Sequence, residues 1–293
     1  PAEPGEFTKR AFLNGRIDLS QAESVMDVIQ AKNEYALKSS LQQLKGAVRT
    51  AIEELRSRIL YQTAFIESAL DDPEHISLDG YPDRLSEEVH QLQKTLSELI
   101  ASSENGRILK EGIRTVILGK PNAGKSSLLN ALVGEERAIV TDIAGTTRDA
   151  LEETIAFQGI TLNLIDTAGI RETEDIVEKI GVGKAKQMAE DADLILYVVD
   201  SSRPLDDNDE DIIELLSGRK SIVIYNKTDL EPVVNMAKLQ ERTGNPVIPV
   251  SIVEEKGIRK LEEEIKNMFF KGELSFNDEV YITNARHKAA LEE

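Results

Sequence analysis

The 293-residue sequence contains no cysteine, which excludes disulfide bonds, thiolate nucleophiles and cysteine-ligated zinc or iron–sulfur centres within it. Its three histidines, His75, His90 and His287, are too widely spaced in the sequence to indicate a metal-binding motif. No apolar run approaches the ~20 residues that a membrane-spanning helix needs. Residues 1–6 have neither the basic nor the apolar region of a signal peptide. We therefore expect a cytoplasmic protein with no membrane contact.

Basic residues are scarce as well. The 35 Lys and Arg residues are outnumbered by 53 Asp and Glu residues, and the formal net charge is −18. Strong unaided binding of nucleic acid needs a basic surface, so any contact with RNA would need a partner protein or a local basic patch. Acidic residues are concentrated at positions 206–211, where we expect a solvated loop or the start of a helix. At roughly 150 residues per domain, the length predicts about two domains.

Apolar residues recur at intervals of three and four through the first part of the chain. Between residues 20 and 70 this spacing predicts one long helix with a single apolar stripe. The sequence Asp-Asp-Pro at residues 71–73 would end that helix, and the same spacing from residue 85 to about residue 109 predicts a second long helix. Two such helices indicate an antiparallel bundle whose apolar stripes form an ordinary core.

After Gly112 the pattern changes to short apolar runs separated by polar turns and helical stretches. This alternation predicts an α/β domain with a mostly parallel sheet and helices on both faces. The expected strands are residues 115–118, 162–165, 194–199, 221–225 and 247–250. The strand pattern stops at Glu273, and residues 284–293 have the composition of another helix. We therefore predict an α/β domain at residues 113–274, inserted in a helical bundle domain formed by residues 1–112 and 275–293.

Residues 119–126, Gly-Lys-Pro-Asn-Ala-Gly-Lys-Ser, match the phosphate-binding pattern G-x-x-x-x-G-K-[ST]. The match follows a predicted strand and precedes a predicted helix at residues 127–133, which is the context that the pattern requires. In such a loop the backbone N–H groups bind phosphate, so Lys125 is expected to contact the β- and γ-phosphates and assist catalysis, and the Ser126 hydroxyl to ligate Mg²⁺. The expected nucleotide-binding residues of this loop are Asn122, Ala123, Gly124, Lys125, Ser126 and Ser127.

A second polar segment, Asp-Thr-Ala-Gly, follows the strand predicted at residues 162–165. Asp166 can hold the Mg²⁺ coordination shell, and the Gly169 N–H can contact the γ-phosphate as a further catalytic group. The polar residues 141–149 lie between this segment and the phosphate loop, and are typical of a switch loop that a nucleotide orders. Thr147, or alternatively Thr146, would complete the Mg²⁺ shell, although an ordinary connecting loop explains these residues as well.

Base identity is indicated by a third segment. Asn226, Lys227 and Asp229 follow another predicted strand, and the Asp229 carboxylate can accept hydrogen bonds from the ring N–H and the exocyclic amine of guanine. Adenine lacks this pair of donors, so the segment predicts GTP and GDP rather than adenine nucleotides. Ser251 is expected in a loop that covers the base, although residues 252–253, Ile-Val, depart from the usual Ala-Lys at these positions.

The position that holds a water-orienting glutamine in Ras-like GTPases is occupied by Ile170, whose side chain cannot bind water. Another group must therefore orient the attacking water. Glu178 is a candidate, and Glu172, Glu174 and Asp175 compete with it when only their spacing is considered.

These residues carry a resemblance to a known family. The GTPase set includes Gly-x-Pro-Asn at residues 119–122 and Gly-Thr-Thr-Arg-Asp at residues 145–149. A second feature is Pro-Gly-Glu-Phe-Thr-Lys-Arg-Ala-Phe-Leu-Asn-Gly-Arg-Ile-Asp-Leu at residues 4–19. On both features the chain resembles, over essentially its whole length, the MnmE (TrmE) family, the GTPases of tRNA wobble-uridine modification.

The resemblance implies an activity that GTPase motifs alone do not disclose. With an FAD-dependent partner, MnmG (GidA), the family installs an aminomethyl-type group on carbon 5 of the wobble uridine, using a one-carbon unit from a folate. The chain would reach tRNA through that complex, as a homodimer whose GTPase domain acts as a conformational motor.

The resemblance also implies hydrolysis without an arginine finger. GTPase domains of the family pair across the nucleotide face, and K⁺ takes the place of the finger, since a cation beside the β- and γ-phosphates neutralises the charge that develops there. The K⁺ ligands carry over to Asn122 and to the carbonyl groups of Thr141, Ile143 and Thr146. The family's catalytic glutamate aligns with Glu178.

The sequence departs from the family at both ends. The family has an N-terminal folate-binding domain before the segment at residues 4–19 and a cysteine-containing C-terminal tail, and neither is present in this sequence. We therefore expect a fragment that binds and hydrolyses GTP and does not modify tRNA unaided.

Two other functions fit the motifs. A GTPase of ribosome assembly would share the phosphate-loop asparagine and the apolar residue at position 170, but such proteins usually carry a basic RNA-binding module. A non-catalytic scaffold would use GTP only to control pairing of its helical domain.

Overall fold

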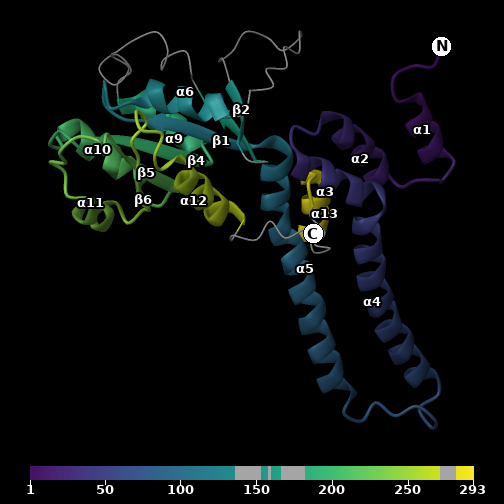
Figure 1. Cartoon of the computed structure of the whole chain (residues 1–293). Coiled ribbons are helices and arrows are strands. Elements are labelled where there is room, and N and C mark those ends of the chain that lie inside the picture. Colours follow the sequence, from purple (N-terminus) through teal and green to yellow (C-terminus); the bar gives the residue numbers. More distant parts are fainter. Residues whose placement is uncertain (136–152, 158–159, 166–181, 271–281) are drawn as a thin grey trace. The chain divides into compact units, whose positions relative to one another are not determined.

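The computed structural model describes residues 1–135, 153–157, 160–165, 182–270 and 282–293 (Figure 1). Contacts between Cα atoms divide the chain into two compact units. One consists of Pro1–Lys110 and Phe276–Glu293, and the other of Glu111–Ser275. Within the described ranges, no helix combines the length and the apolar character that crossing a membrane requires.

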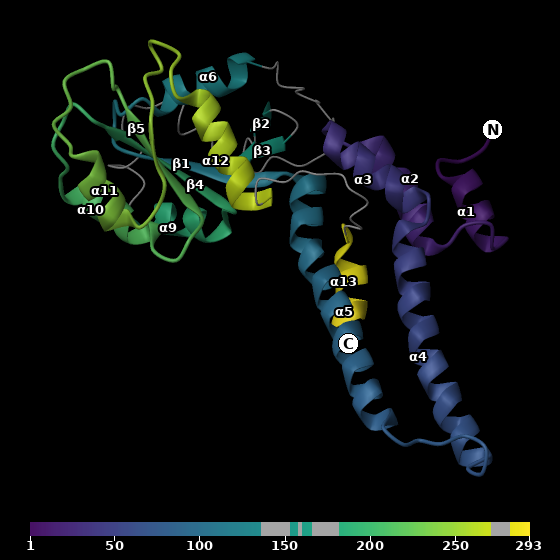
Figure 2. The same ribbon diagram turned by 60° about the horizontal axis from the view of Figure 1, so that its bottom comes forward.

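The first unit is built of helices, as the apolar periodicity predicts. They are α1 (Glu6–Leu13), α2 (Leu19–Gln30), α3 (Glu34–Leu44), α4 (Ala47–Asp71), α5 (Tyr81–Glu111) and α13 (Ala285–Glu292). Helices α4 and α5 run in opposite directions and are joined by a short connection (Figures 1 and 2). Arg58 and Glu88 form a 2.7 Å ion pair between them, and the ring centroids of Phe65 and Tyr81 lie 4.7 Å apart. This antiparallel pair is the bundle expected from the two apolar stripes.

The single helix expected between residues 20 and 70 is wrong, because the chain forms three helices there, α2, α3 and α4. The Asn33 side chain caps α3 by accepting a hydrogen bond from the Ala36 N–H. Gly46 precedes α4 with φ +90°, a left-handed conformation that glycine adopts without strain. Both breaks leave the apolar spacing nearly intact, so periodicity alone could not reveal them.

The segment that returns to the helical unit packs closely against α5. A Cβ atom added at Gly106 would lie 2.3 Å from the Ile282 carbonyl oxygen, so glycine is required for this approach. The Ile282 N–H also donates to Ser102 Oγ at 3.2 Å. Backbone contact between α5 and the returning chain therefore depends on one small residue near the C-terminal end of a long helix.

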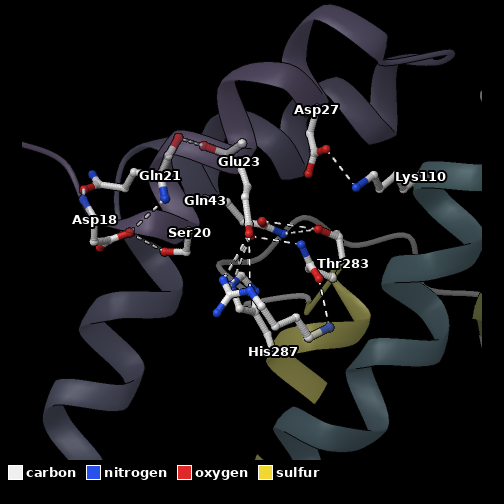
Figure 3. Close-up of polar contacts among 12 residues, drawn as sticks. Asp18, Ser20, Gln21, Glu23, Asp27, Gln43, Lys110, Thr283 and His287 are labelled. Carbon is white, nitrogen blue, oxygen red and sulfur yellow. Dashed lines mark hydrogen bonds and ion pairs between the residues drawn. The ribbon is translucent and has the colours of Figure 1, made fainter. Parts of the chain in front are cut away.

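Polar contacts then hold α13 against α2 and α3 (Figure 3). Glu23 of α2 accepts a hydrogen bond from Asn284 Nδ2 at 2.9 Å and forms a 3.1 Å ion pair with Arg286. Gln43 of α3 donates to Thr283 Oγ1 at 2.8 Å. Because the Arg286 side chain is half exposed, its ion pair contributes at most about 1 kcal/mol. These contacts serve mainly to align the returning chain.

The second unit contains a six-stranded sheet in the order β2-β3-β1-β4-β5-β6. Its strands are β1 (Ile113–Leu118), β2 (Glu153–Phe157), β3 (Ile160–Leu164), β4 (Leu194–Asp200), β5 (Ser221–Asn226) and β6 (Val247–Pro249). All neighbouring pairs are parallel except β2 and β3. The five strands expected from the sequence are present, and the mostly parallel α/β class is confirmed.

Strand β2 was not expected from the sequence. It lies at the edge of the sheet and pairs antiparallel with β3, with Ile155 opposite Leu162. Ile155 is fully buried, whereas Thr154 and Ala156 on either side of it are only partly buried. A strand this short with one buried apolar residue has too little alternation to be recognised before its partner is known.

Helices cover both faces of this sheet, with α6 and α12 on one and α9, α10 and α11 on the other (Figure 2). These helices are α6 (Lys125–Glu135), α9 (Val182–Asp191), α10 (Asp207–Leu216), α11 (Met236–Thr243) and α12 (Ile258–Phe270). On the second face, buried side chains of α9, α10 and α11 form one core with Val116, Tyr197 and Val223 of the central strands. The hydrophobic central strands are thus buried on both faces, as parallel sheets require.

Candidate nucleotide-binding site

Those predicted site residues that the structure describes lie at the carboxyl ends of the parallel strands β1, β5 and β6. The phosphate loop follows β1, Asn226 is the last residue of β5, and Ser251 follows β6. In parallel α/β sheets, ligands bind at this edge, where loops from neighbouring strands converge. The sheet therefore brings segments together that are far apart in the sequence.

Two glycines of the phosphate loop are required by close backbone contacts. Gly119 has φ +147°, and a Cβ atom there would lie 2.5 Å from the Val198 carbonyl oxygen of β4. Gly124 has φ +104°, and a Cβ atom there would lie 2.2 Å from Asn226 Nδ2. Asn122 also adopts a left-handed conformation, with φ +61°. The loop therefore presents its backbone in a shape that only glycine permits at these two positions.

Lys125 begins α6, and its ammonium group is held inside the phosphate loop. Its Nζ atom donates to the carbonyl oxygens of Gly119 and Lys120, each at 2.7 Å. Burial lowers the pKa of Lys125 to about 8, because the charged form is partly removed from water. A bound phosphate would reverse that effect by placing negative charge beside the ammonium.

This pKa predicts that nucleotide affinity depends on pH. Below the pKa of the free chain, Lys125 is already charged and affinity is at its full value, and affinity falls as the pH rises through about 8. Raising the pH from about 7.4 to about 8.4 should weaken GDP binding about threefold, with uptake of most of a proton at the higher pH. Titration calorimetry in two buffers of different ionisation enthalpy would measure both the affinity for GDP and the number of protons taken up on binding. Affinity that stays constant over this range would show that Lys125 is fully charged in the free chain.

The base-recognition segment is connected to the phosphate loop by Asn226. Its Nδ2 atom donates to the Ala123 carbonyl at 2.8 Å, and its side chain is almost fully buried. Its Oδ1 atom is also buried and has no hydrogen-bond partner among the described residues. A buried acceptor without a partner costs free energy, so this atom is suited to accept from a ligand or a water molecule.

Asp229 and Ser251 are also brought together. The Ser251 Oγ donates to Asp229 Oδ1 at 2.7 Å, and Asp229 itself is exposed. The hydroxyl orients a carboxylate that has a second oxygen and further lone pairs for a ligand. Ser251 lies against the base-recognition segment, as the sequence predicts. Val253, one of the two following residues that depart from the usual Ala-Lys, is 86% exposed.

Two functional candidates were missed by the sequence interpretation. Asp200, at the end of β4, accepts a 2.6 Å hydrogen bond from Lys227 Nζ. Burial alone would raise the pKa of the Asp200 carboxyl, but hydrogen bonds from Lys227 and Ser202 outweigh that effect and lower the pKa. Asp209, in the acidic run, is buried and pairs with Lys120 of the phosphate loop at 2.6 Å. The position of Asp200 at the end of an apolar strand could have indicated its role from the sequence. No sequence pattern distinguishes Asp209 from the other acidic residues around it.

Several predicted site residues lie outside the described ranges. They are Thr141, Ile143, Thr146, Thr147, Asp166, Gly169, Ile170, Glu172, Glu174, Asp175 and Glu178. Of the expected Mg²⁺ ligands the structure describes Ser126, and of the expected K⁺ ligands Asn122. Both residues are exposed in the same loop as Lys125, and their side chains carry oxygen atoms of the kind these ions accept. The described ranges contain no group of three or more His, Cys, Asp or Glu residues that could hold a metal by itself.

Comparison with known proteins gives one family. A family model described as the MnmE helical domain matches residues 19–293. The chain is 61% identical over 292 residues to the tRNA modification GTPase MnmE of Lachnoclostridium phytofermentans. It is 48% identical over 294 residues to the protein of the same name from Bacillus subtilis. Each alignment covers 100% of this chain and 64% of the relative, so the chain spans somewhat less than two thirds of the length of these proteins.

A solved structure of the G domain of the T. maritima FeoB iron transporter is 29% identical to the matched part, with a TM-score of 0.40. That match covers 53% of this chain and 98% of the FeoB chain.

Proposed function

The chain belongs to the MnmE family, and from that premise we propose that it binds and hydrolyses GTP as the GTPase part of a tRNA modification protein. The observation that carries the proposal is the connection of the phosphate loop to the base-recognition segment. The Asn226 side chain donates to the Ala123 carbonyl of the loop, while Ser251 orients Asp229 at the next strand end. One ligand with phosphates at Lys125 and guanine at Asp229 accounts for both features.

The proposed reaction is direct attack of water on the γ-phosphorus. A bond forms between the water oxygen and phosphorus, and the bond to the oxygen that bridges to the β-phosphate breaks, leaving GDP and phosphate. Lys125 stabilises the charge on the β- and γ-phosphate oxygens, Gly169 donates its N–H to the γ-phosphate, and Glu178 orients the water. Mg²⁺ held by Ser126, Thr147 and Asp166 would supply further neutralisation of the same oxygens.

Stimulation by K⁺ and by pairing of GTPase domains belongs to the same proposal. K⁺ would be held by the Asn122 side chain and by carbonyl groups of Thr141, Ile143 and Thr146. Exposure of the Asn122 side chain, in the same loop as Lys125, supports this part of the proposal. Pairing would then convert GTP turnover into movement of the helical unit, through its connections to the α/β unit.

The tRNA chemistry is proposed from the family. The chain would work as a homodimer with an FAD-dependent partner, MnmG (GidA), in adding an aminomethyl-type group to carbon 5 of the wobble uridine. The folate-derived carbon would be bound by a part of the protein that this sequence does not contain. With a net charge of −18, the chain is suited to reach tRNA through its partner.

Phosphate release tests the proposal. GTP turnover should be at least about tenfold faster in KCl than in NaCl at matched ionic strength, because a positioned cation replaces an arginine finger. The rate per chain should also rise with protein concentration, since pairing completes the site. Equal rates in both salts would leave an ordinary GTPase and remove the role of Asn122. Bound GTP with no phosphate release in either salt would indicate a GTP-regulated scaffold.

A further inference from the structure

One acidic residue of the run at positions 206–211 is buried. Asp206 caps α10 and its neighbours Asp207, Glu210 and Asp211 are exposed, as expected for a solvated helix start. Asp209, in the first turn of α10, is only 1% exposed, so the expectation of a solvated segment is wrong at this position. A buried carboxylate costs free energy unless it is paired and hydrogen-bonded, so its partners show what it is there to hold.

The carboxylate of Asp209 is fully engaged by three groups. The Tyr197 hydroxyl of β4 donates to its Oδ1 atom at 2.7 Å. Its Oδ2 atom lies 2.6 Å from Lys120 Nζ and accepts from the Asp206 N–H at 2.9 Å. Tyr197 is itself completely buried between β1 and β5, so the position of Asp209 is determined by the core of the sheet.

Lys120 transmits this position to the phosphate loop. It is the second residue of the loop, and its side chain is 18% exposed because it points to Asp209 and Asp206. Its carbonyl oxygen and that of Gly119 are the two acceptors of the Lys125 ammonium. Gly119 is itself held against the Val198 carbonyl of β4. Both residues that hold Lys125 are therefore positioned by β4. Gly119 contacts the β4 backbone directly, and Lys120 is held through Asp209, which is hydrogen-bonded to Tyr197 of β4.

The charges around Lys120 keep it protonated, so its ion pair with Asp209 persists. Burial by itself would lower the pKa of Lys120, but hydrogen bonds to Asp209 and Asp206 outweigh burial and raise the pKa. Lys120 therefore stays charged when Lys125, with its lowered pKa, begins to lose its proton. Asp206 is more than half exposed, so it cannot replace Asp209 as a fixed partner.

We propose that Asp209 is a positioning residue for nucleotide binding, which acts through Lys120 to hold the Lys125 ammonium where the β- and γ-phosphates bind. The inference rests on the proposed function and deepens it. The phosphate-binding pattern allows any residue at position 120, yet here the side chain at that position joins the loop to the core. Without the Asp209 charge, Lys120 would turn toward solvent and Asp206, and its carbonyl would no longer be held in place.

The test is the affinity of the full chain and its Asp209→Asn variant for GDP and for GMP, measured by titration calorimetry. Asparagine keeps the size of the side chain and removes the charge that binds Lys120. We expect GDP affinity to fall about tenfold, since small displacements of a phosphate-binding group are costly. GMP affinity should change less than about twofold, because GMP lacks the phosphates that Lys125 contacts.

Glu210→Gln is the matched control. Glu210 is the next residue of α10, is exposed, and pairs with Arg242 rather than with the phosphate loop. Glu210→Gln removes the same charge from the same helix turn as Asp209→Asn does. The affinities for GDP and for GMP should both be unchanged in this control. Lys120→Gln should reproduce the selective loss for GDP, and Lys120→Arg should restore most of the affinity by keeping the ion pair. Lys120→Gln also provides the test if Asp209→Asn fails to fold in a thermal unfolding measurement.

The outcomes separate this inference from the function on which it rests. Equal losses for GDP and GMP would show that Asp209 only stabilises the fold, and would overturn the positioning role. Unchanged GDP affinity in a folded variant would overturn it as well. If the unaltered chain binds no GDP, the proposed function fails, and this inference fails with it. A loss confined to GDP, absent in Glu210→Gln, would establish the role.

Discussion

Replacing Lys125 with alanine is expected to reduce the affinity for GTP by at least about 100-fold, because the variant loses two charge-assisted contacts worth roughly 1.5–3 kcal/mol each. The structure shows why no neighbour can compensate. Lys120, the nearest other ammonium of the loop, is already bound to Asp206 and Asp209. The binding constant would be measured by titration of GTP and of its non-hydrolysable analogue.

Lys238→Ala serves as the control for Lys125→Ala. Lys238 is an exposed lysine of α11 in the same unit. Its replacement by alanine changes the net charge by the same amount as Lys125→Ala and leaves the phosphate loop unaltered. Its affinity for GTP should equal that of the unaltered chain. Thermal unfolding of both variants would show that the sheet is retained. GTP affinity that survives in Lys125→Ala would remove the assignment of residues 119–126 as the phosphate-binding loop.

The second large effect is expected from Asp229→Asn. In the proposed site the carboxylate would accept from the ring N–H and the amine of guanine, whereas an asparagine amide would donate to the carbonyl group that xanthine has at the position of that amine. A site whose polar groups must hydrogen-bond the ligand strongly rejects a base whose donors and acceptors do not match them, because those groups are then left unpaired. We expect the ratio of GDP to xanthosine diphosphate affinity to fall by at least about 100-fold, since two hydrogen bonds to a charged group are exchanged.

Competition between the two diphosphates for the same protein measures this ratio directly. Glu231→Gln is the matched variant, because Glu231 is an exposed carboxylate two residues away and its change removes the same charge. It should leave the preference for guanine intact. Ser251 hydrogen-bonds Asp229 and would also orient the new amide. A preference that is unchanged in Asp229→Asn, or equally changed in Glu231→Gln, would show that the base is recognised elsewhere.

Much of the candidate site could be predicted because its chemistry depends on local sequence. The phosphate loop needs glycine at positions 119 and 124, and the contacts with Val198 and Asn226 show the physical reason. The position of Ser251 beside Asp229 was expected from its place after a strand. Family membership confirms the resemblance that these residues carry. The roles of Glu178 and of the ion ligands stay predictions, since most of those residues lie outside the described ranges.

The remaining features depend on backbone geometry and strand pairing, which the spacing of apolar residues does not report. Residues 20–70 form three helices because Asn33 and Gly46 act on backbone geometry, to which apolar spacing is insensitive. The short edge strand β2 has one fully buried apolar residue among its described side chains, and becomes a strand by pairing with β3. The helix breaks come from a side-chain cap and a left-handed glycine, and the edge strand comes from hydrogen bonds with β3; the spacing of apolar side chains encodes none of the three.

By itself, the sequence determined the type of most elements and the glycine-dependent shape of the loop at residues 119–126, because periodicity and backbone-restricting residues act within a few positions. The guanine preference stays a prediction. Only the tertiary structure decided which charges are buried. Asp209 reads as one of several solvated carboxylates until the sheet places Tyr197 and Lys120 around it. Burial of a charge depends on which groups arrive from elsewhere to pair with it, and that is a property of the folded chain.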